Sequence, residues 1–356
     1  MRKVAIIGSH GLYANYGGWD QLVKNLAEKN SDIELHYVVF NSKEAPIDIP
    51  NLPTRVVVKH INLKASGFEG LFYDFWTILV CYFKVDTILL LGVQGIPLIP
   101  ILKLFKNTTI ISNVGGLEWE RPKFSYWAKL YLKFCFNLSF LLSKNVILDN
   151  EYYFKFAPKS RKYKAVIIPY GGEIDTSLDI TNALSEKYIF LEKEYYLSIS
   201  RALEDNFIDK ICETFSQTKA TLVLISNFTS SAYGKEVFEK YSNISNIILI
   251  NGLYQKNELD LVRRKCKAYI HTHTLCGTAP SLVEMIIARK PIISVDVSQN
   301  RFTLDNAGVF FKSYDELKHI LESDLDLSIV LPKQELRAKY DWQIIVNSYQ
   351  DLYKVK

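Results

Sequence analysis

The chain has 356 residues, of which 48% are hydrophobic and 23% are charged, and its formal net charge is +5. This length favours about two domains, whose cores are large enough to fold without disulfides or metals. Five scattered cysteines without a CxxC pair exclude a zinc ribbon and a disulfide framework, and they favour a reducing, cytoplasmic compartment. The first eleven residues, MRKVAIIGSHG, have a strand pattern from their start, so we expect no signal peptide.

Short β-branched runs alternate with helical patterns through the first half of the chain. The segment 17–29 is one such helical pattern, with Leu22, Val23 and Leu26 on one face. This alternation is typical of a parallel sheet wrapped by helices. The runs that we predict as strands are 3–8, 33–40, 54–61, 86–92, 108–114, 144–150 and 164–171.

The segment 87–105 is apolar enough to suggest a membrane span. Gly92, Gly95, Pro97 and Pro100 interrupt it, however, and a span needs about 20 continuous apolar residues. We therefore expect a buried strand, a turn and a short apolar helix here.

A second series of strand-like runs follows a polar, poorly periodic segment at 171–194. We therefore expect an α/β protein with two Rossmann-like, doubly wound domains facing a cleft, at 1–180 and 190–338, and a C-terminal helical segment, 339–356, that crosses back to the first domain. Ligands of such folds bind outside the carboxyl ends of the strands and between domains. The runs of the second series are 194–200, 220–226, 246–252, 268–274, 290–296 and 308–311.

The first predicted strand ends in a glycine-rich segment, GSHGLYANYGGWD, at 8–20. Glycines let the backbone approach a ligand closely, and the helix that begins near Asp20 offers free N–H groups to an anion. The pattern differs from GxGxxG, and the second strand ends without the acid that holds a ribose in dinucleotide folds. A nicotinamide enzyme is therefore disfavoured, while a glycine-rich turn without a ligand stays possible.

The segment GTAPSLVE, at 277–284, lies between a predicted strand and a predicted helix. Pro280 suits the first helical position, where no N–H is needed, and the N–H groups from Thr278 to Leu282 would point at a phosphate. The carboxylate of Glu284, a turn further on, can accept hydrogen bonds from two sugar hydroxyls. A nucleotide diphosphate fits this arrangement, although a capped helix with an ordinary first-turn glutamate fits it equally well.

Basic and aromatic residues interleave in the segment 119–164. Ten lysines and arginines stand against three acids there, and the aromatic residues include Trp119 and Trp127. A solvated helix face or a surface for an anionic membrane would have this composition. Single strands of nucleic acid bind similar mixtures, but no recognisable nucleic-acid module accompanies this one, so we expect no nucleic-acid partner.

Several motifs, in a fixed order along nearly the whole chain, resemble those of GT-B glycosyltransferases of the GT4 type. More narrowly, the chain is similar to the bacterial rhamnosyltransferase branch, which has a DUF1972-like N-terminal domain. The motifs are YGGWD, NVGGLEWER, IPYGGE, SRALEDN, NFTSSAYGK, YIHTHTLCGTAPSLVE and KPIISVDVSQNRFTL.

The resemblance implies transfer of a sugar from a nucleotide diphosphate sugar to a lipid-linked saccharide, with retention of anomeric configuration. The first expectation is L-rhamnose from dTDP-rhamnose, used in bacterial surface polysaccharides such as O-antigen or capsule. The resemblance also places the protein in the cytoplasm, peripherally on the inner face of the bacterial cell membrane, with an anionic membrane surface as a further partner. A UDP-linked hexose or galactofuranose donor, or a non-catalytic partner subunit of the same fold, remains an alternative.

The resemblance also implies roles for individual residues, and it implies no cofactor and no obligatory metal. The sequence fits this, because we find no DxD motif that would chelate a metal against the diphosphate. Arg201 is the implied cation that meets the charge of the leaving diphosphate, and Lys235 is a weaker alternative. The implied catalytic residues are Asp20, Glu118, Arg201 and His10. The implied acceptor-binding residues are Trp19, Glu118, Trp119 and Arg121. The implied donor-binding residues are Gly17, Gly18, Arg201, His271, His273, Gly277, Thr278, Ser281, Leu282, Glu284 and Asn300.

Four positions depart from the pattern of the branch. Gly115 stands where the branch has aspartate, His10 where it has arginine, Cys276 where it has glycine and Ala279 where it has asparagine. These departures cluster at the expected site. They leave the donor sugar and the group that activates the acceptor open.

Overall fold

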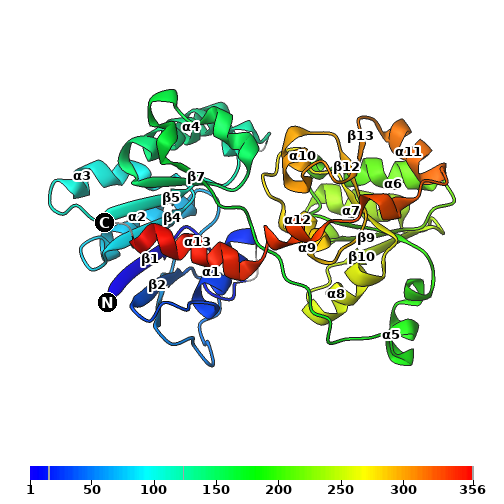
Figure 1. The fold of residues 1–356 in the computed structure, drawn as a ribbon, viewed down its shortest axis with the longest axis horizontal. Helices are drawn as coiled ribbons and strands as arrows, with labels where there is room; N and C mark the ends of the chain where they lie inside the picture. Colours follow the sequence, from blue (N-terminus) through cyan, green and yellow to red (C-terminus); the bar gives the residue numbers. More distant parts are fainter. Residues whose placement is uncertain (15–16, 123, 355–356) are drawn as a thin grey trace. The chain divides into compact units, whose positions relative to one another are not determined.

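The computed structural model describes residues 1–14, 17–122 and 124–354, which form two compact α/β units (Figure 1). The first unit comprises Met1–Gly171 and the C-terminal segment that begins at Trp342, and the second comprises Gly172–Asp341. Each unit is a parallel sheet covered by helices on both faces, which confirms the predicted fold class of two Rossmann-like units.

The first unit has a seven-stranded parallel sheet in the order β3-β2-β1-β4-β5-β6-β7. The strand order reverses between β1 and β4, the point at which doubly wound sheets bind ligands. Every run predicted from the sequence corresponds to one strand, although β1 begins and β2 ends one residue outside its run. The strands are β1 (Arg2–Ile7), β2 (Leu35–Asn41), β3 (Val56–His60), β4 (Thr87–Leu91), β5 (Thr109–Asn113), β6 (Asn145–Leu148) and β7 (Ala165–Ile167).

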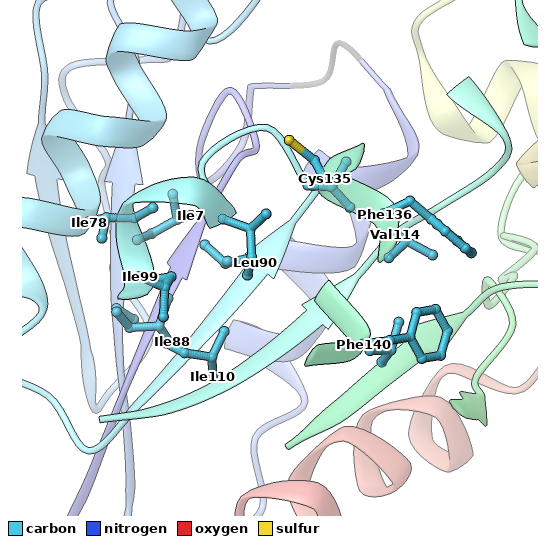
Figure 2. Packing of buried hydrophobic residues seen from close by; sticks show 14 of the residues in the cluster. Ile7, Ile78, Ile88, Leu90, Ile99, Ile110, Val114, Cys135, Phe136 and Phe140 are labelled. Atoms are coloured by element: carbon cyan, nitrogen blue, oxygen red, sulfur yellow. The ribbon is translucent and has the colours of Figure 1, made fainter. Parts of the chain in front are cut away.

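Two helical layers cover this sheet. Helices α2, α3 and α4 pack on one face, and α1 and α13 pack on the other. Figure 2 shows part of the first core, where Ile99 lies near Ile88 and Leu90 and Phe136 lies beside Val114. The helices of this unit are α1 (Gly18–Glu28), α2 (Glu69–Cys81), α3 (Ile99–Lys103), α4 (Tyr126–Leu142) and α13 (Trp342–Lys354), with short 3-10 helices η1 (Ile96–Leu98), η2 (Glu118–Glu120), η3 (Glu151–Phe156) and η4 (Lys159–Lys164).

The second unit has a six-stranded parallel sheet in the order β10-β9-β8-β11-β12-β13, which reverses between β8 and β11. All four central strands are largely buried, as expected for a sheet covered on both faces. The strands are β8 (Tyr196–Ile199), β9 (Leu222–Ser226), β10 (Ile247–Asn251), β11 (Ala268–His271), β12 (Ile292–Val295) and β13 (Val309–Phe311).

Helices α8, α9, α10 and α12 contribute to the core on one face of this sheet, and α6, α7 and α11 to that on the other. Helix α9 is the next element after β11, which ends at His271, and a loop joins the two. The helices are α5 (Asn182–Lys187), α6 (Ile208–Ser216), α7 (Ala232–Tyr241), α8 (Lys256–Lys265), α9 (Pro280–Ile287), α10 (Ser298–Leu304), α11 (Tyr314–Glu322) and α12 (Gln334–Ala338), with 3-10 helices η5 (Ile189–Glu192), η6 (Glu204–Asn206), η7 (Phe228–Ser230) and η8 (Leu327–Val330).

The units divide earlier than the expected boundary at 180–190, because the polar segment after Gly171 is bonded to the second unit. The Asp175 N–H donates to the Asp260 carboxylate at 2.8 Å, and the Tyr188 hydroxyl donates to Glu258. At the other end the chain leaves the second unit after Asp341 rather than after residue 338. Polar composition alone does not reveal that a segment without a core of its own is held by buried carboxylates.

The apolar segment 87–105 forms β4, η1 and α3, as predicted. Within the described residues, the structure has no helix with both the length and the apolar character that crossing a membrane requires.

Candidate functional site

Buried polar atoms without a hydrogen-bond partner lie where central strands of both sheets end. Such atoms are rare in folded proteins, since burial without a partner costs free energy. In the described part of the chain, they include Ser9 Oγ after β1, Ser200 Oγ after β8, Ser226 Oγ at the end of β9, both ring nitrogens of His271 at the end of β11 and Asn300 Oδ1 in α10. Their position beside the strand-order reversals indicates a ligand site in each unit.

His271 is almost fully enclosed, with 1% of its surface exposed. Its ring lies between those of Tyr269 and His273, at centroid distances of 5.9 and 4.6 Å. The two histidines thus share one face, as their alternation predicts. Burial lowers the pKa of His271 well below its usual value, with a smaller contribution from His273, so the imidazole is neutral at physiological pH. A neutral ring offers a ligand one donor and one acceptor.

Asn300 ties the end of β11 to the end of β12. Its side-chain nitrogen donates to the backbone oxygens of His273 at 3.1 Å and Val295 at 3.2 Å. This leaves the amide oxygen inside the site without a partner. The residue therefore both positions the loop after β11 and presents an acceptor there.

The first turn of α9 supplies fewer N–H groups than the sequence predicts. The Leu282 N–H already donates to the Ala279 oxygen at 3.0 Å, and its side chain is part of the core. The Ser281 hydroxyl forms a hydrogen bond with the Tyr269 hydroxyl. Leu282 therefore does not offer its N–H to a phosphate in this structure, because the first turn of α9 closes on the carbonyl of its own N-cap residue.

Glu284 is held by a network of charged residues that sequence analysis missed. Its Oε2 accepts a hydrogen bond from Arg263 Nη2, and Arg263 Nη1 donates to Asp260 at 2.6 Å. Asp260, which is fully buried, also accepts from Lys256 at 2.6 Å. Burial raises the pKa of the Glu284 carboxyl, and the Arg263 guanidinium opposes this rise.

This network leaves part of the glutamate open. About a quarter of the Glu284 side chain is exposed (24%), whereas Arg263 has only 6% exposure. No hydrogen bond to Oε1 is present among the described residues. Arg263 thus holds the carboxylate through Oε2, and Oε1 remains available to a ligand. Asp260 and Arg263 lie three residues apart on the buried side of α8, which is the one signal in the sequence that could have revealed the pair.

Arg201 follows β8 and has an exposed side chain. Its backbone oxygen accepts from the Asn206 side chain at 2.8 Å. The next residue, Ala202, accepts from the Ser231 hydroxyl at 2.8 Å, and Ser231 caps α7. Because Lys235 is in the first turn of α7, the loop carrying Arg201 and the helix carrying Lys235 lie together at this end of the sheet.

In the first unit, Asp20 organises the glycine-rich loop. Its buried carboxylate accepts the His10 N–H at 2.9 Å and the Gly17 N–H at 3.2 Å. His10 Nδ1 lies 3.5 Å from Asp20 Oδ2, and His10 Nε2 lies 3.8 Å from Glu44 Oε2. The structure therefore brings His10 and Asp20 together and adds Glu44, which no local motif marked. An imidazole between two carboxylates is equipped to take up a proton.

Glycines of this loop have different tasks. A side chain at Gly8 would place Cβ 2.0 Å from the Leu91 oxygen, and one at Gly11 would place it 2.3 Å from the Asn41 side chain. Both glycines also have positive φ angles, so they serve the folding of the loop itself. Gly17 is exposed, with open space where a Cβ would be. Of these three glycines, Gly17 is the one that leaves room for a ligand. Residues 15 and 16 of the motif lie outside the described residues.

The indole of Trp19 occupies the space in front of Gly115. A Cβ at Gly115 would lie 3.1 Å from Trp19 Cζ2, and one at Gly92 would lie 3.3 Å from Trp19 Cη2. The ring thus covers the ends of β4 and β5. The absent carboxylate at position 115 and the large aromatic residue at position 19 are therefore parts of one arrangement.

The predicted acceptor residues of η2 divide into two kinds. Arg121 Nε pairs with Glu118 Oε1 at 3.1 Å, and both side chains keep some exposure. Trp119 instead packs edge to face on Phe136, at 4.7 Å, as part of the core. Trp119 is therefore not placed to stack on an acceptor in this structure, because the short helix turns its indole inward.

One further buried acid escaped sequence analysis, Asp74 on α2. Burial raises its pKa to about 7, opposed by a hydrogen bond with the Gln94 side chain. Its Oδ1 has no hydrogen-bond partner in the described structure. Asp74 lies in the aromatic run 68–76, where nothing in the spacing distinguishes a buried acid from a solvated one.

Comparisons with known proteins agree with this architecture. Residues 1–51 match the model of a family described as a domain of unknown function, DUF1972. No curated protein sequence is significantly similar to the chain. A sucrose-phosphate synthase from Thermosynechococcus elongatus has a similar structure, with 16% identity, a TM-score of 0.79 and coverage of 99% of this chain and 98% of that one.

Two further similar structures carry nucleotide ligands. Anabaena HepE, in complex with UDP and glucose, has 14% identity and a TM-score of 0.75, and all of both chains is covered. An E. coli structure, described as trehalose-6-phosphate bound with UDP-2-fluoro glucose, has 11% identity and a TM-score of 0.71, again over all of both chains. At these identities the likeness concerns the fold, and the chain has the two-unit architecture of GT-B glycosyltransferases.

Proposed function

We propose that this protein is a glycosyltransferase that moves a sugar from a nucleotide diphosphate sugar to an acceptor saccharide. The observation that carries this proposal is Glu284, fixed from behind by Arg263 with one oxygen outward, in a site where His271 and Asn300 present unpartnered polar atoms. A carboxylate so placed suits the two hydroxyls of a ribose. The neutral imidazole of His271 suits a sugar or phosphate oxygen.

The cation for the leaving diphosphate is Arg201, with Lys235 as the nearby second choice. Positive charge aimed at charge that develops in the transition state is usually the largest contribution to such catalysis. Both residues are exposed and lie at the end of the second sheet where the unpartnered polar atoms gather. The remaining donor contacts that we assign are Thr278 and Gly277 in the loop before α9.

The first unit supplies the acceptor side in this proposal. His10, between Asp20 and Glu44, is the group that would accept the proton of the acceptor hydroxyl. It takes the task that a carboxylate at position 115 would have. Trp19, Glu118 and Arg121 are the assigned acceptor contacts.

The donor and the acceptor follow from the resemblance stated above. We assign L-rhamnose from dTDP-rhamnose as the donor and a lipid-linked saccharide as the acceptor, with retention of configuration, no metal and no cofactor. This places the protein on the inner face of the bacterial cell membrane, in the synthesis of a surface polysaccharide such as O-antigen or capsule. The UDP bound in similar structures supports a UDP-sugar as the second candidate donor.

Thermal stabilisation by dTDP, UDP, GDP and ADP, measured without metal, tests the donor site. A ligand at about a hundred times its Kd stabilises the native state by about 2.7 kcal/mol. We expect a shift with dTDP that is lost in Glu284→Gln. The matched control is Glu239→Gln, an exposed glutamate on α7, which should keep the shift. Transfer from dTDP-rhamnose and from a panel of UDP-sugars then identifies the sugar.

A shift with UDP alone would replace rhamnose but retain glycosyl transfer. No shift with any of the four nucleotides in a folded protein would contradict the proposal. The alternative of a non-catalytic partner subunit would then account better for the glycine at position 115.

A further inference from the structure

Three helices of the first unit expose large apolar side chains to solvent. Trp76 on α2 is 54% exposed and Trp127 on α4 is 77% exposed. We call the whole set the aromatic face. Its residues are Phe68, Phe72, Trp76, Leu79 and Phe83 on and beside α2, Ile101, Leu104 and Phe105 on and after α3, and Tyr126, Trp127, Leu130, Phe134 and Leu141 on α4.

Their spacing makes continuous stripes along the helices. On α2 the exposed residues recur at intervals of four, four, three and four, which places them on one side of a helix. The opposite side of each helix lies in the core, as Figure 2 shows for Ile78, Ile99 and Phe136. These helices are therefore apolar on both sides. In water such a helix is normally buried, so the outward stripe indicates a missing partner.

The three helices lie next to one another. The Tyr82 hydroxyl, just after α2, donates to the Lys106 oxygen at 2.8 Å, beyond the end of α3. Lys103 of α3 donates to the Leu142 oxygen, at the end of α4, at 2.8 Å. Figure 1 shows α2, α3 and α4 on the same side of the first sheet. The stripes thus belong to one surface.

The charges on this surface have one sign. Helices α3 and α4 contain no aspartate or glutamate, whereas α4 carries Lys129 and Lys133. Of the two acids on α2, Asp74 is buried and Glu69 is paired with Lys43 at 2.7 Å. Lysines among exposed aromatic residues, without competing acids, match an interface of anionic headgroups over acyl chains. Lys123, between η2 and α4, lies outside the described residues.

We propose that the aromatic face docks on an anionic lipid bilayer, with Trp76 and Trp127 at the depth of the headgroups. Helix α4 has 17 residues and α2 has 13, so both are too short to span a bilayer and would lie in its plane. The geometry disfavours a second copy of the chain as the occupant. A symmetric pair would set the same surface against itself and bring lysines opposite lysines.

This inference extends the proposed function by naming the surface that brings the enzyme to a lipid-linked acceptor. The proposed function required only an acceptor on the membrane. Docking is measured without substrate, so its failure leaves the nucleotide experiment above unaffected, and failure of nucleotide binding leaves docking to be judged by itself.

The test is co-sedimentation with vesicles of phosphatidylglycerol and phosphatidylcholine in equal parts, and with phosphatidylcholine alone. We expect binding to the mixed vesicles at low salt, weakened about ten-fold or more in Trp76→Ser/Trp127→Ser. Brominated lipids should quench the tryptophan fluorescence of the wild type and should quench that of the double variant far less. The thermal shift by nucleotide should stay unchanged in the variant, which shows that it is folded.

The matched control replaces apolar residues that are equally exposed but isolated. Tyr254 (83% exposed) and Ile329 (74% exposed) lie in the second unit, on different segments. Tyr254→Ser/Ile329→Ser should bind vesicles as the wild type does. Equal binding by both double variants would overturn the assignment. Absence of vesicle binding together with a concentration-dependent dimer would assign the face to a second copy instead.

Discussion

In the second unit the buried carboxylate of Asp260 accepts hydrogen bonds from Arg263 and Lys256, whereas in the first unit that of Asp74 has only the side-chain amide of Gln94. The paired acid holds Arg263, and through it Glu284, in a fixed position. The other acid has a pKa raised to about 7 by burial, so its charge changes near neutral pH. One topology thus provides a rigid charged site in one unit and a titratable interior in the other.

The outer surfaces of the two units also differ in polarity. Helix α8 of the second unit exposes charged residues such as Lys265, whereas α2 and α4 of the first unit carry the aromatic face. Because the two sheets have similar strand orders, these differences reflect mainly the side chains of the covering helices. They are consistent with the proposed function, in which the nucleotide binds the second unit and the lipid-linked acceptor the first.

Removal of Arg263 should have the largest effect. Arg263→Ala leaves Asp260 and Glu284 without their shared cation, and loss of one partner from a buried ion pair costs about 3–5 kcal/mol. We expect this loss in the urea-induced unfolding of the second unit, together with loss of nucleotide binding. The control Lys210→Ala removes an exposed pair with Glu213 and should cost less than about 1 kcal/mol. Similar losses in the two variants would show that the network carries little of the stability.

Replacing Asp74 should change how stability depends on pH. Because its folded pKa is above its unfolded value, the native state binds more protons than the unfolded state between about pH 4 and pH 7. The wild type therefore loses stability as pH rises through this window, by up to about 4 kcal/mol. Asp74→Asn lacks this loss, so it should gain relative to the wild type from pH 4 to pH 8. Parallel pH profiles of the unfolding free energy would contradict the account.

Adding a carboxylate at position 115 tests the role of Trp19. Gly115→Asp should destabilise the first unit by about 1–3 kcal/mol, because the new side chain meets the indole and because Gly115 has a positive φ that strains any side chain. Trp19→Phe makes room, so Gly115→Asp should cost markedly less in that background. Unfolding free energies of the two single variants and the double variant give the coupling. If the two effects simply add, the indole does not occupy the place of the side chain.

Much of the fold could be predicted because β-branched runs and helical spacing recur at a regular interval. Each of the thirteen strands lies, to within one residue, inside a run marked by composition alone, from Arg2–Ile7 to Val309–Phe311. The boundary between the units was predicted too late, because the segment 173–193 is held by acids of α8 and by a few apolar residues, such as Phe190 and Leu191, that pack into the core of the second unit. Such pairings become visible only when the chain is folded.

Of the candidate site, too, one part could be predicted from the sequence and another part could not. Glu284 and His271 could be named as candidates from the sequence because each stands at a fixed place relative to a strand end and a helix start. Arg263, Asp74 and Glu44 could not, since their importance depends on partners far away in sequence. Trp119 and Leu282 show the opposite error, because a motif marks positions but does not tell which side chain faces the core.

The smallest effect concerns two helix caps of the second unit. Ser231 caps α7 and Ser313 caps α11, so Ser231→Ala and Ser313→Ala should each cost about 1 kcal/mol of stability. The Ser231 hydroxyl also donates to the Ala202 oxygen, next to Arg201. Ser231→Ala should therefore lower kcat for sugar transfer several-fold with little change in KM, if Arg201 acts on the leaving diphosphate as we propose. Ser313→Ala should leave kcat unchanged. Equal kcat values in the two variants would show that the cap does not position the Arg201 loop, and the cation would then have to be sought at Lys235.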